Sequence, residues 1–528
     1  MSKLNIIKPV YTDELYTPIA VKKKFYLKNS SELLNKKAAC VSFNTDRYTT
    51  FMRKGAYVLL DFGQELCGGV RFITRKTKGT ARVLIRFGES ITEAVTPVGI
   101  KNSTNDHSPR ELTVSITTLS DLCFGQSGFR FVYIELLSDN AISFQNIFAV
   151  NHLQVFPFEG EITTNDAKVN DIIKTAVYTL KLCCQNNCIW DGIKRDRLVW
   201  SGDMHQEILS VLYMFGNIEN IKNSISFVRN DTDLSFWVNW MPSYSAWWII
   251  NLCEYCRVSG DIEYFEENAD YAAATLKKIN ASISDEGNMV LENTVMPYFL
   301  DWPTVGTEDA VCGTASLFIL AAKAFRKFRE NAEADAIIRK LSQVLEKSSP
   351  VTKQAITFAY LAGKKFENLP KILENGGAHG FSTFMSYYII KADVAENGKN
   401  AIDIIKQYFG AMLERGATTF WEDFNLDWMN GSGRIDKFPK SGQKDIHGDF
   451  GAYCYKNFRH SLCHGWSAGL LAFFVEEVIG LKINNGTVCE ITPNLMGLEY
   501  VKARLPFGNE ILNIIVDENG VKCVSEQL

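Results

Sequence analysis

Residues 157–180 read PFEGEITTNDAKVNDIIKTAVYTL, and this stretch separates two hydrophobic patterns. Thr164 or Asn165 is a candidate helix N-cap, because a short polar side chain can accept hydrogen bonds from the first free backbone N–H groups. Apolar residues then recur at the spacing of a helix face, at Val169, Ile172, Ile173, Ala176 and Leu180. We therefore expect a helical region to begin here.

The chain before this point alternates short β-type runs with turn residues. The runs are AYVLLDF (56–62), GGVRFITR (68–75), ARVLIRFGE (81–89), ELTVSITTL (111–119) and FRFVYIELL (129–137). Short strands separated by Gly, Asp, Asn and Ser are typical of an antiparallel β-sandwich. The sequence thus predicts an N-terminal β-sandwich accessory domain over residues 1–160.

Helical patterns dominate from residue 161 to residue 480. Clear examples are 207–228, 247–258, 315–347 and 466–479. A region of this size has room for roughly a dozen helices of average length, which suits a barrel of six helical hairpins, written (α/α)6. Residues 481–528 return to a β pattern with Gly-containing turns, and we expect a small C-terminal β-sheet domain there.

The composition excludes several classes of function. Lys and Arg number 56 against 60 Asp and Glu, the net charge is −4, and no basic run stands out, so we expect no nucleic-acid partner. No apolar run is long enough to span a membrane. The first residues, MSKLNIIKPV, lack the apolar core of a secretory signal, which predicts a cytoplasmic protein, or a periplasmic or secreted one if a signal has been removed. The sequence leaves the oligomeric state open.

No cofactor or metal site is expected. The thirteen Cys are scattered without a metal or disulfide spacing, and the Cys253–Cys256 pair lies in a helical, apolar stretch. No Gly-rich phosphate loop follows a strand, and no G-x-S-x-G elbow is present. His460 and His464 are four residues apart, but no third ligand accompanies them.

The densest polar cluster is WDGIKRDRLVWSGD, residues 190–203. It places three carboxylates and three cations between two tryptophans. Mutual pairing allows such charges to be partly buried, and perturbed carboxylate pKa values are what acid/base chemistry requires. A charged loop that caps a helix would have the same composition, so composition alone leaves both interpretations open.

Four further segments carry aromatic and polar residues together. They are GATTFWEDF (416–424), MPSYSAWW (241–248), FLDW (299–302) and SLCHGWS (461–467). Taken singly, each could be structural: Glu422 could be an exposed acid beside a core Trp, and His464 a satisfied structural histidine.

Together these segments resemble the α-L-rhamnosidases, glycoside hydrolase family 78 of the six-hairpin glycosidases. The catalytic loop of that family reads D-C-P-x-R-D-E-R-x-x-W-x-G-D. Residues 200–203 match its W-x-G-D end, Asp191, Arg195 and Arg197 match its D and two R positions, and Asp196 stands where the family has its acid Glu. The present loop is one residue shorter and has Gly-Ile for Cys-Pro, which resembles a subgroup with a short K-R-D-R motif.

The resemblance implies inverting hydrolysis of terminal α-L-rhamnosyl residues from a carbohydrate substrate. Glu422 matches the general base of the family's T-T-x-W-E segment, and Asp196 is the expected acid, with Asp203 as the second candidate. The two carboxyls should then stand about 6.5 to 9.5 Å apart. Substrate contacts are expected from the following residues: Asp191, Arg195, Trp200, Trp247, Trp302, Asp301 and His464.

Two features keep other functions open. Asp is one methylene shorter than Glu, and a cation beside Asp196 favours its charged form, which works against an acid role. A carbohydrate-binding protein with a degenerate site, or a glycosidase or lyase for another sugar on the same barrel, is the alternative. Glu65 and Glu89 could reach the cleft from the β region, but we expect no catalytic role for either.

Overall fold

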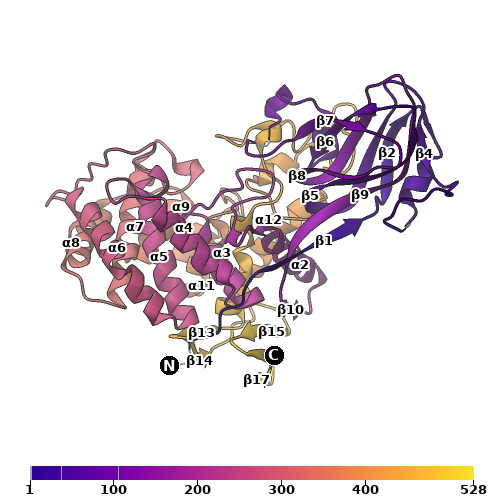
Figure 1. The fold of residues 1–528 in the computed structure, drawn as a ribbon. Helices are drawn as coiled ribbons and strands as arrows, with labels where there is room; N and C mark the ends of the chain where they lie inside the picture. Colours follow the sequence, from indigo (N-terminus) through magenta and orange to yellow (C-terminus); the bar gives the residue numbers. More distant parts are fainter. Residues whose placement is uncertain (1–2, 37, 105, 528) are drawn as a thin grey trace.

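The computed structural model describes residues 3–36, 38–104 and 106–527. An antiparallel β region and a helical region lie side by side, and a small sheet at the base holds the last strands (Figure 1). Each of the two large regions encloses its own hydrophobic core. The predicted order of β, large α and small β is therefore present, and the predicted domain limits remain predictions.

The β region is one connected sheet of nine antiparallel strands. β5 pairs with β2, β8 and β9 along its length, and β9 pairs with β1, β4 and β5, so the sheet wraps around its core. The strands are β1 (Val10–Tyr16), β2 (Ala20–Phe25), β3 (Leu27–Lys28), β4 (Thr49–Phe51), β5 (Tyr57–Thr77), β6 (Ala81–Gly88), β7 (Glu111–Ile116), β8 (Asp121–Leu136) and β9 (Ile142–Val155). Three short helices join them: η1 (Ser30–Leu34), α1 (Ile91–Val95) and η2 (Ile100–Asn102).

The first two predicted strands form a single strand, β5. Its pairing with β8 changes register between Asp61 and Leu66 and again between Gly68 and Val70. The Asp61 carboxylate accepts from the backbone N–H of Gly63 at 2.8 Å, which stabilises the first irregularity. The polar residues between the two apolar runs thus mark bulges within one strand, which a sequence pattern does not distinguish from a turn.

The helical region begins close to the predicted point. Its first helix is capped by Asp166, whose Oδ1 accepts from the N–H groups of Lys168 and Val169, so the N-cap prediction of Thr164 or Asn165 was wrong by one or two residues. The main helices are α2 (Ala167–Cys183), α3 (Met204–Phe215), α4 (Glu219–Asn230), α5 (Pro242–Ser259), α6 (Ile262–Ala281), α7 (Glu308–Arg326), α8 (Ala332–Lys347), α9 (Lys353–Ala362), α10 (Leu369–Leu373), α11 (Ser386–Ala395), α12 (Ala401–Glu414) and α13 (Leu470–Phe473).

Two predicted helical runs are each divided by a capping residue. The run 207–228 breaks at Gly216, whose φ of 79° lies in the left-handed region that favours glycine, and α4 then starts in a new direction. The run 315–347 breaks before α8, where the Asn331 side chain accepts from the N–H of Ala334. Single-turn helices fill several connections: η3 (Val238–Trp240), η4 (Trp302–Thr304), η5 (Leu426–Met429), η6 (Asn457–Arg459), η7 (Gly465–Ala468) and η8 (Phe474–Val478).

Six helices contact one another in a closed ring. α3 packs on α5, α5 on α7, α7 on α9, α9 on α11, α11 on α13, and α13 returns to α3. The longer members of this ring are buried on almost every side, as expected for inner helices. α4 and α8 each bury a single stripe, such as Ala334, Ile337, Leu341 and Leu345 on α8, so they lie on the outside.

The remaining strands tie the ends of the helical region together. β10 (Glu161–Thr164), which precedes α2, pairs with β15 (Val501–Phe507) in a sheet completed by β16 (Glu510–Asp517) and β17 (Gly520–Gln527). Two hairpins complete the fold: β11 (Cys184–Gln185) with β12 (Cys188–Ile189), and β13 (Leu481–Asn484) with β14 (Thr487–Ile491). Among the described residues, no helix combines the length and hydrophobicity needed to cross a bilayer.

Candidate active site

A cavity of about 230 Å³ gathers most of the predicted site residues. It is lined by Asp191, Arg195, Asp196, Trp200, Asp203, Asn239, Met241, Tyr244, Val295, Met296, Phe299, Trp302, Glu422, Cys454, Tyr455, Arg459, His464 and Trp466. The loop before α3, the segment after α12 and the segment before η7 each contribute. Residues far apart in the sequence thus meet in one pocket.

Asp191 organises the loop from which most of the polar groups come. Its Oδ1 accepts from the N–H of Leu198 at 2.9 Å and its Oδ2 from the N–H of Asp196 at 3.1 Å. The backbone C=O of Asp191 also accepts from the N–H of Gly465 at 2.7 Å. Burial raises the pKa of Asp191 to about 7, and Asp196 adds to the rise. This carboxyl therefore fixes the loop and remains close enough to the cavity to meet a ligand.

Arg195 joins the two carboxylates expected to perform catalysis. Its Nη1 donates to Asp196 Oδ1 at 2.7 Å, and its Nη2 donates to Glu422 Oε1 at 2.6 Å. Burial lowers the pKa of Arg195, but Glu422 and then Asp196 outweigh burial and raise it overall. Because the two carboxylates bind different nitrogens, the guanidinium lies between them and keeps them apart.

Glu422 is buried and held at both oxygens. Oε1 accepts from Arg195, and Oε2 accepts from the backbone N–H of Ser461 at 3.1 Å. Burial raises the pKa of Glu422 to about 8, although Arg195 and the Ser461 N–H act in the opposite direction. A buried carboxylate next to a cation and with a fixed orientation is suited to accept a proton from water.

Asp203 lies deeper than Asp196. Its side chain is 5% exposed against 22% for Asp196, and the Tyr244 hydroxyl donates to its Oδ1 at 3.3 Å. Burial raises the pKa of Asp203 well above the ordinary value, and Asp191 and Glu422 add to the rise. The surroundings of Asp203 therefore favour its protonated form, whereas Asp196 lies nearer to the opening of the cavity.

His464 faces three of these carboxylates. Its Nε2 lies 3.7 Å from Asp191 Oδ2, 3.9 Å from Asp203 Oδ2 and 3.6 Å from Glu422 Oε1. Burial, and then Arg195, lower its pKa well below 6.5, so the ring is neutral. A neutral imidazole among acidic groups can exchange hydrogen bonds with the hydroxyls of a sugar.

Three of these residues, Asp191, Asp203 and His464, form a possible cation site. The ligand atoms of Asp191, Asp203 and His464 lie within 4.8 Å of one another. A metal-bound histidine usually donates its second N–H to an acceptor. The Nδ1 of His464 is buried and has no hydrogen-bond partner in the described part of the chain, so this feature does not favour a metal.

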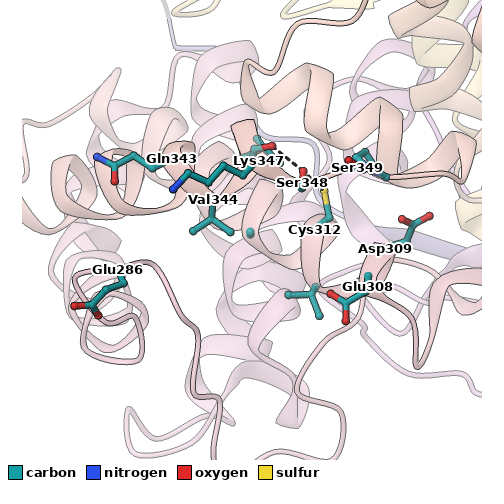
Figure 2. A pocket seen from close by; sticks show the side chains of 13 residues that line it. Glu286, Glu308, Asp309, Cys312, Gln343, Val344, Lys347, Ser348 and Ser349 are labelled. Carbon is teal, nitrogen blue, oxygen red and sulfur yellow. Dashed lines mark hydrogen bonds between the residues drawn. The ribbon is translucent and has the colours of Figure 1, made fainter.

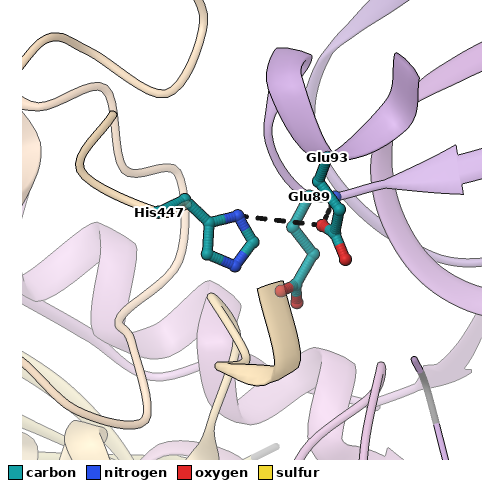
Figure 3. Close-up of side chains that lie close together, drawn as sticks. All are labelled: Glu89, Glu93 and His447. Atoms are coloured by element: carbon teal, nitrogen blue, oxygen red, sulfur yellow. Dashed lines mark hydrogen bonds and ion pairs between the residues drawn. The ribbon is translucent and has the colours of Figure 1, made fainter. Parts of the chain in front are cut away.

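A second group of possible ligands lies outside the cavity. Glu89, Glu93 and His447 approach one another where the β region meets the helical region (Figure 3). The Lys194 ammonium lies 3.1 Å from Glu89 and 3.2 Å from Glu93. Both nitrogens of His447 are also engaged, with Ser90 and with the C=O of His460. Lys194 thus already supplies the cation at this position.

Aromatic side chains form the walls of the cavity. Trp302 packs at 5.3 Å from Phe299, at 5.5 Å from Tyr455 and at 5.9 Å, in a stacked arrangement, from Tyr453. Ring faces of this kind pack well against the apolar C–H side of a pyranose. The predictions that Trp200 and Trp302 line the pocket agree with this geometry.

The structure corrects the expected positions of Trp247 and Asp301. Trp247 is 2% exposed and packs in the core against His205, Phe358 and Tyr388, because the face of α5 that carries it points into the helix ring. The Asp301 carboxylate caps η4 by accepting from the N–H of Trp302 at 2.9 Å, and it also accepts from Ser382. Neither side chain lines the cavity.

Part of the cavity lining was not predicted from the sequence. Cys454 and Tyr455 come from an irregular segment, and Arg459 ends the short helix η6, just before the SLCHGWS segment. Tyr455 packs under the Arg195 guanidinium, 5.2 Å from ring centroid to Cζ. The only available signal was the closeness of an aromatic residue and an arginine to that motif.

A larger cavity of about 550 Å³ lies at α7 and α8 (Figure 2). Its lining includes Glu308, Asp309, Cys312 and Lys347, and none of the described residues that line it is aromatic. The Asp309 carboxylate accepts from the backbone N–H of Thr352 at 2.7 Å and so stabilises the start of α9. None of the predicted site residues lies there, and we assign the candidate active site to the smaller cavity.

The chain is similar to known proteins in sequence pattern and in fold. Residues 157–362 match the family model of the bacterial alpha-L-rhamnosidase 6 hairpin glycosidase domain. A search of curated protein sequences finds no match. The matched segment contains the 190–203 loop and the helices α2 to α9. It is similar to six-hairpin glycosidase domains, and the matching model is that of the α-L-rhamnosidases.

Solved structures show the same fold at low identity. A rhamnosidase from Klebsiella oxytoca with rhamnose bound has a TM-score of 0.67 at 20% identity, over 88% of this chain and 96% of that one. The GH78 family rhamnosidase of Bacillus sp. GL1 has a TM-score of 0.66 at 18% identity, over 92% of this chain and 53% of that one. The Streptomyces avermitilis alpha-L-rhamnosidase complexed with L-rhamnose has a TM-score of 0.63 at 14% identity, over 88% and 47%. The chain thus spans nearly all of the first structure and about half of the other two.

Proposed function

We propose that this protein is an inverting α-L-rhamnosidase that removes terminal α-L-rhamnosyl residues from a glycan or glycoside. The observation that carries the proposal is the pairing of Asp196 and Glu422 on one arginine inside an aromatic cavity. The likeness to rhamnosidase structures and to the family model supports the substrate class. The ring of contacts among α3, α5, α7, α9, α11 and α13 supports an (α/α)6 six-hairpin barrel as the catalytic domain.

Glu422 acts as the general base in this proposal. Once ionised, it takes a proton from a water molecule that attacks the anomeric carbon on the face opposite the leaving oxygen. Arg195 and the Ser461 N–H fix the direction of its two oxygens. The C–O bond to the leaving group breaks as the new C–O bond forms, so the configuration at this carbon inverts.

Asp196 is assigned as the proton donor to the leaving oxygen. It lies nearer to solvent than Asp203, and the aglycone must depart on the open side of the cavity. Asp203, whose buried surroundings raise its pKa, is placed to bind a hydroxyl of the sugar, together with Asp191 and His464. Substrate binding must loosen the contact between Arg195 and Asp196, because a carboxylate held by a cation is a poor proton donor.

The lining of the cavity suits a deoxysugar. The small volume fits a single terminal residue better than the middle of a polysaccharide. Met241, Met296 and Phe299 supply apolar contacts for a methyl group, and Trp302 supplies a flat wall. The polar groups lie together on the side of Asp191, Asp203 and His464, where they can contact ring hydroxyls.

A panel of aryl glycosides tests the proposal. We expect hydrolysis of the α-L-rhamnoside, and β-L-rhamnose as the first product when the reaction is followed by ¹H NMR. Release of α-L-rhamnose first would contradict inversion. Cleavage of a different glycoside in preference would indicate another sugar on the same fold, and rhamnose binding without turnover would indicate a binding protein with a degenerate site.

A further inference from the structure

We infer that Glu89, in the β region, is a positioning residue for the base Glu422. The inference rests on the proposed function, because it concerns the same active site. Glu89 directly follows β6, is fully buried, and lies where the sheet meets the segment that precedes η7. It does not line the cavity, so any effect on the reaction must pass through other residues.

Glu89 binds the backbone that holds Glu422. Its Oε2 accepts from the N–H of Leu462 at 2.6 Å, and its Oε1 accepts from the Ser461 hydroxyl at 3.2 Å. The N–H of Ser461 donates to Glu422 Oε2 at 3.1 Å, and the C=O of Ser461 accepts from the N–H of Glu422 at 3.0 Å. One residue, Ser461, is therefore fixed by the β region on one side and fixes the base on the other.

Lys194 gives Glu89 a second connection to the same carboxylate. Its ammonium lies 3.1 Å from Glu89 Oε2 and donates to the C=O of Phe458 at 2.9 Å and to the C=O of His460. The next residue in the chain is Arg195, which donates to Glu422 Oε1. The two oxygens of Glu422 thus bind the Arg195 guanidinium and the Ser461 N–H. Both groups belong to chain segments that Glu89 and Lys194 hold in place.

Cations offset the charges of this cluster, although burial still raises the pKa of Glu89 to about 7. Two carboxylates, Glu89 and Glu93, face the cations Lys194 and Arg110, and the Arg110 Nε lies 3.4 Å from Glu93 Oε1. Without a nearby cation, a buried carboxyl group would stay protonated. The His447 ring completes the packing between the β region and the segment at 460, as Figure 3 shows for its approach to Glu93.

The test compares Glu89→Ala and Glu89→Gln with Glu65→Ala. Glu65 is the control, because it is a buried carboxyl of the same sheet whose side chain makes no hydrogen bond or ion pair to residues 460–464 within the described chain, although its charge acts on Glu89 and Cys463. For Glu89→Ala we expect kcat to fall about 100-fold while KM changes little, since small displacements of a catalytic group cost rate. Glu89→Gln keeps an acceptor for Leu462 and should recover part of this loss.

A pH profile separates positioning from a purely structural role. If the Ser461 N–H moves away, Glu422 loses a hydrogen bond to its charged form, and the acid limb of kcat/KM should move to higher pH. The groups that face Glu422 and contribute to that limb are Arg195, Asp196, Asp191, Asp203, His464 and Tyr455. Equal losses of kcat in Glu89→Ala and Glu65→Ala would overturn the inference. So would an acid limb of kcat/KM that stays at the wild-type pH in both Glu89 variants. If Glu89→Ala does not fold, the limb of Glu89→Gln decides.

Crystal structures of the variants test the inference without activity. We expect the distance from Ser461 N to Glu422 Oε2 to exceed 3.5 Å in Glu89→Ala and to stay at the native value in Glu65→Ala. A native distance in Glu89→Ala would overturn the positioning role even if the enzyme is active. If the wild-type protein cleaves no glycoside, the proposed function fails, and this distance still decides whether Glu89 positions Glu422.

Discussion

Arg195 donates from Nη2 to Oε1 of Glu422 at 2.6 Å, although the two residues are 227 positions apart in the chain. Its other terminal nitrogen holds Asp196. The two groups proposed to move protons therefore share one cation in the ligand-free state. Substrate must redistribute these contacts before Asp196 can donate a proton and Glu422 can accept one.

Replacing Glu422 with Gln should remove catalysis and leave the fold intact. The amide cannot accept a proton from water, but it retains an oxygen for the Ser461 N–H. We expect kcat on an aryl α-L-rhamnoside to fall by about 10² to 10⁴, the usual contribution of a general base. Asp423→Asn is the control, because Asp423 is an adjacent, half-buried acid that does not line the cavity. Near-native kcat in Glu422→Gln would exclude the base assignment.

Asp196→Asn and Asp203→Asn should respond differently to the leaving group. A proton donor matters most when the leaving oxygen is basic, so Asp196→Asn should retain much of its rate on a dinitrophenyl glycoside and lose about 10² to 10⁴ on an alkyl one. Asp203→Asn should lower kcat/KM for both substrates to a similar degree. The reverse pattern in kcat/KM would assign the acid role to Asp203.

The acid limb of kcat/KM should lie far above the ordinary pKa of a carboxyl. Burial raises the pKa of Glu422 to about 8 and that of Asp191 to about 7. The base must be ionised to act, so kcat/KM should rise with pH until the cluster loses its protons, with an apparent value that belongs to the group as a whole. Rates with a neutral aryl glycoside between pH 4 and 9 check this. An acid limb of kcat/KM near pH 4.5 would contradict this prediction.

Asp203→Asn should stabilise the protein, and the gain should grow with pH. In the unfolded chain Asp203 releases its proton near pH 4, whereas burial keeps the proton on in the folded state. The wild type therefore loses stability as pH rises above about 4, and an uncharged Asn does not. We expect Tm to be unchanged at pH 4 and higher by roughly 1–3 °C at pH 8. An equal difference at both pH values would show that ionisation is not the cause.

Trp302→Ala and Trp247→Ala should separate ligand binding from packing. Trp302 lines the cavity, so its removal should raise KM about tenfold or more with a modest effect on Tm. Trp247 is packed in the core, and its removal should cost about 3 to 5 kcal/mol of stability. Calorimetry and kinetics on both variants check this. A rise in KM in Trp247→Ala but not in Trp302→Ala would show that Trp247 contacts the substrate.

The sequence predicted the polar half of the site better than its surroundings. Asp191, Arg195 and Asp203 lie in one loop with fixed spacing, and their convergence with Glu422 followed from the ordered motifs. The position of Trp247 could not be read in the same way, because one residue along α5 turns a side chain by about 100° and decides between core and cavity. Tyr455 lies in an irregular segment and Arg459 in the single-turn helix η6, and both are too short for a periodic pattern to indicate which side chains point inward.

The fold followed from hydrophobic pattern where elements are regular. The 207–228 run was predicted as helical, and only its break at Gly216 was not. The position of Asp301 required the tertiary structure, because an acid before Trp302 can either cap η4 or contact a ligand, and the Ser382 contact comes from a distant segment.

The pairing of β10 with β15 has a consequence for how the protein is made and engineered. β10 is translated before the whole helical region, and its partner strand only after it. Until β15 has been synthesised, the edge of β10 has no strand to pair with and the apolar side chain of Ile162 stays exposed. A fragment of residues 161–480 would contain β10 without β15. We therefore expect it to aggregate unless the last strands are supplied to it.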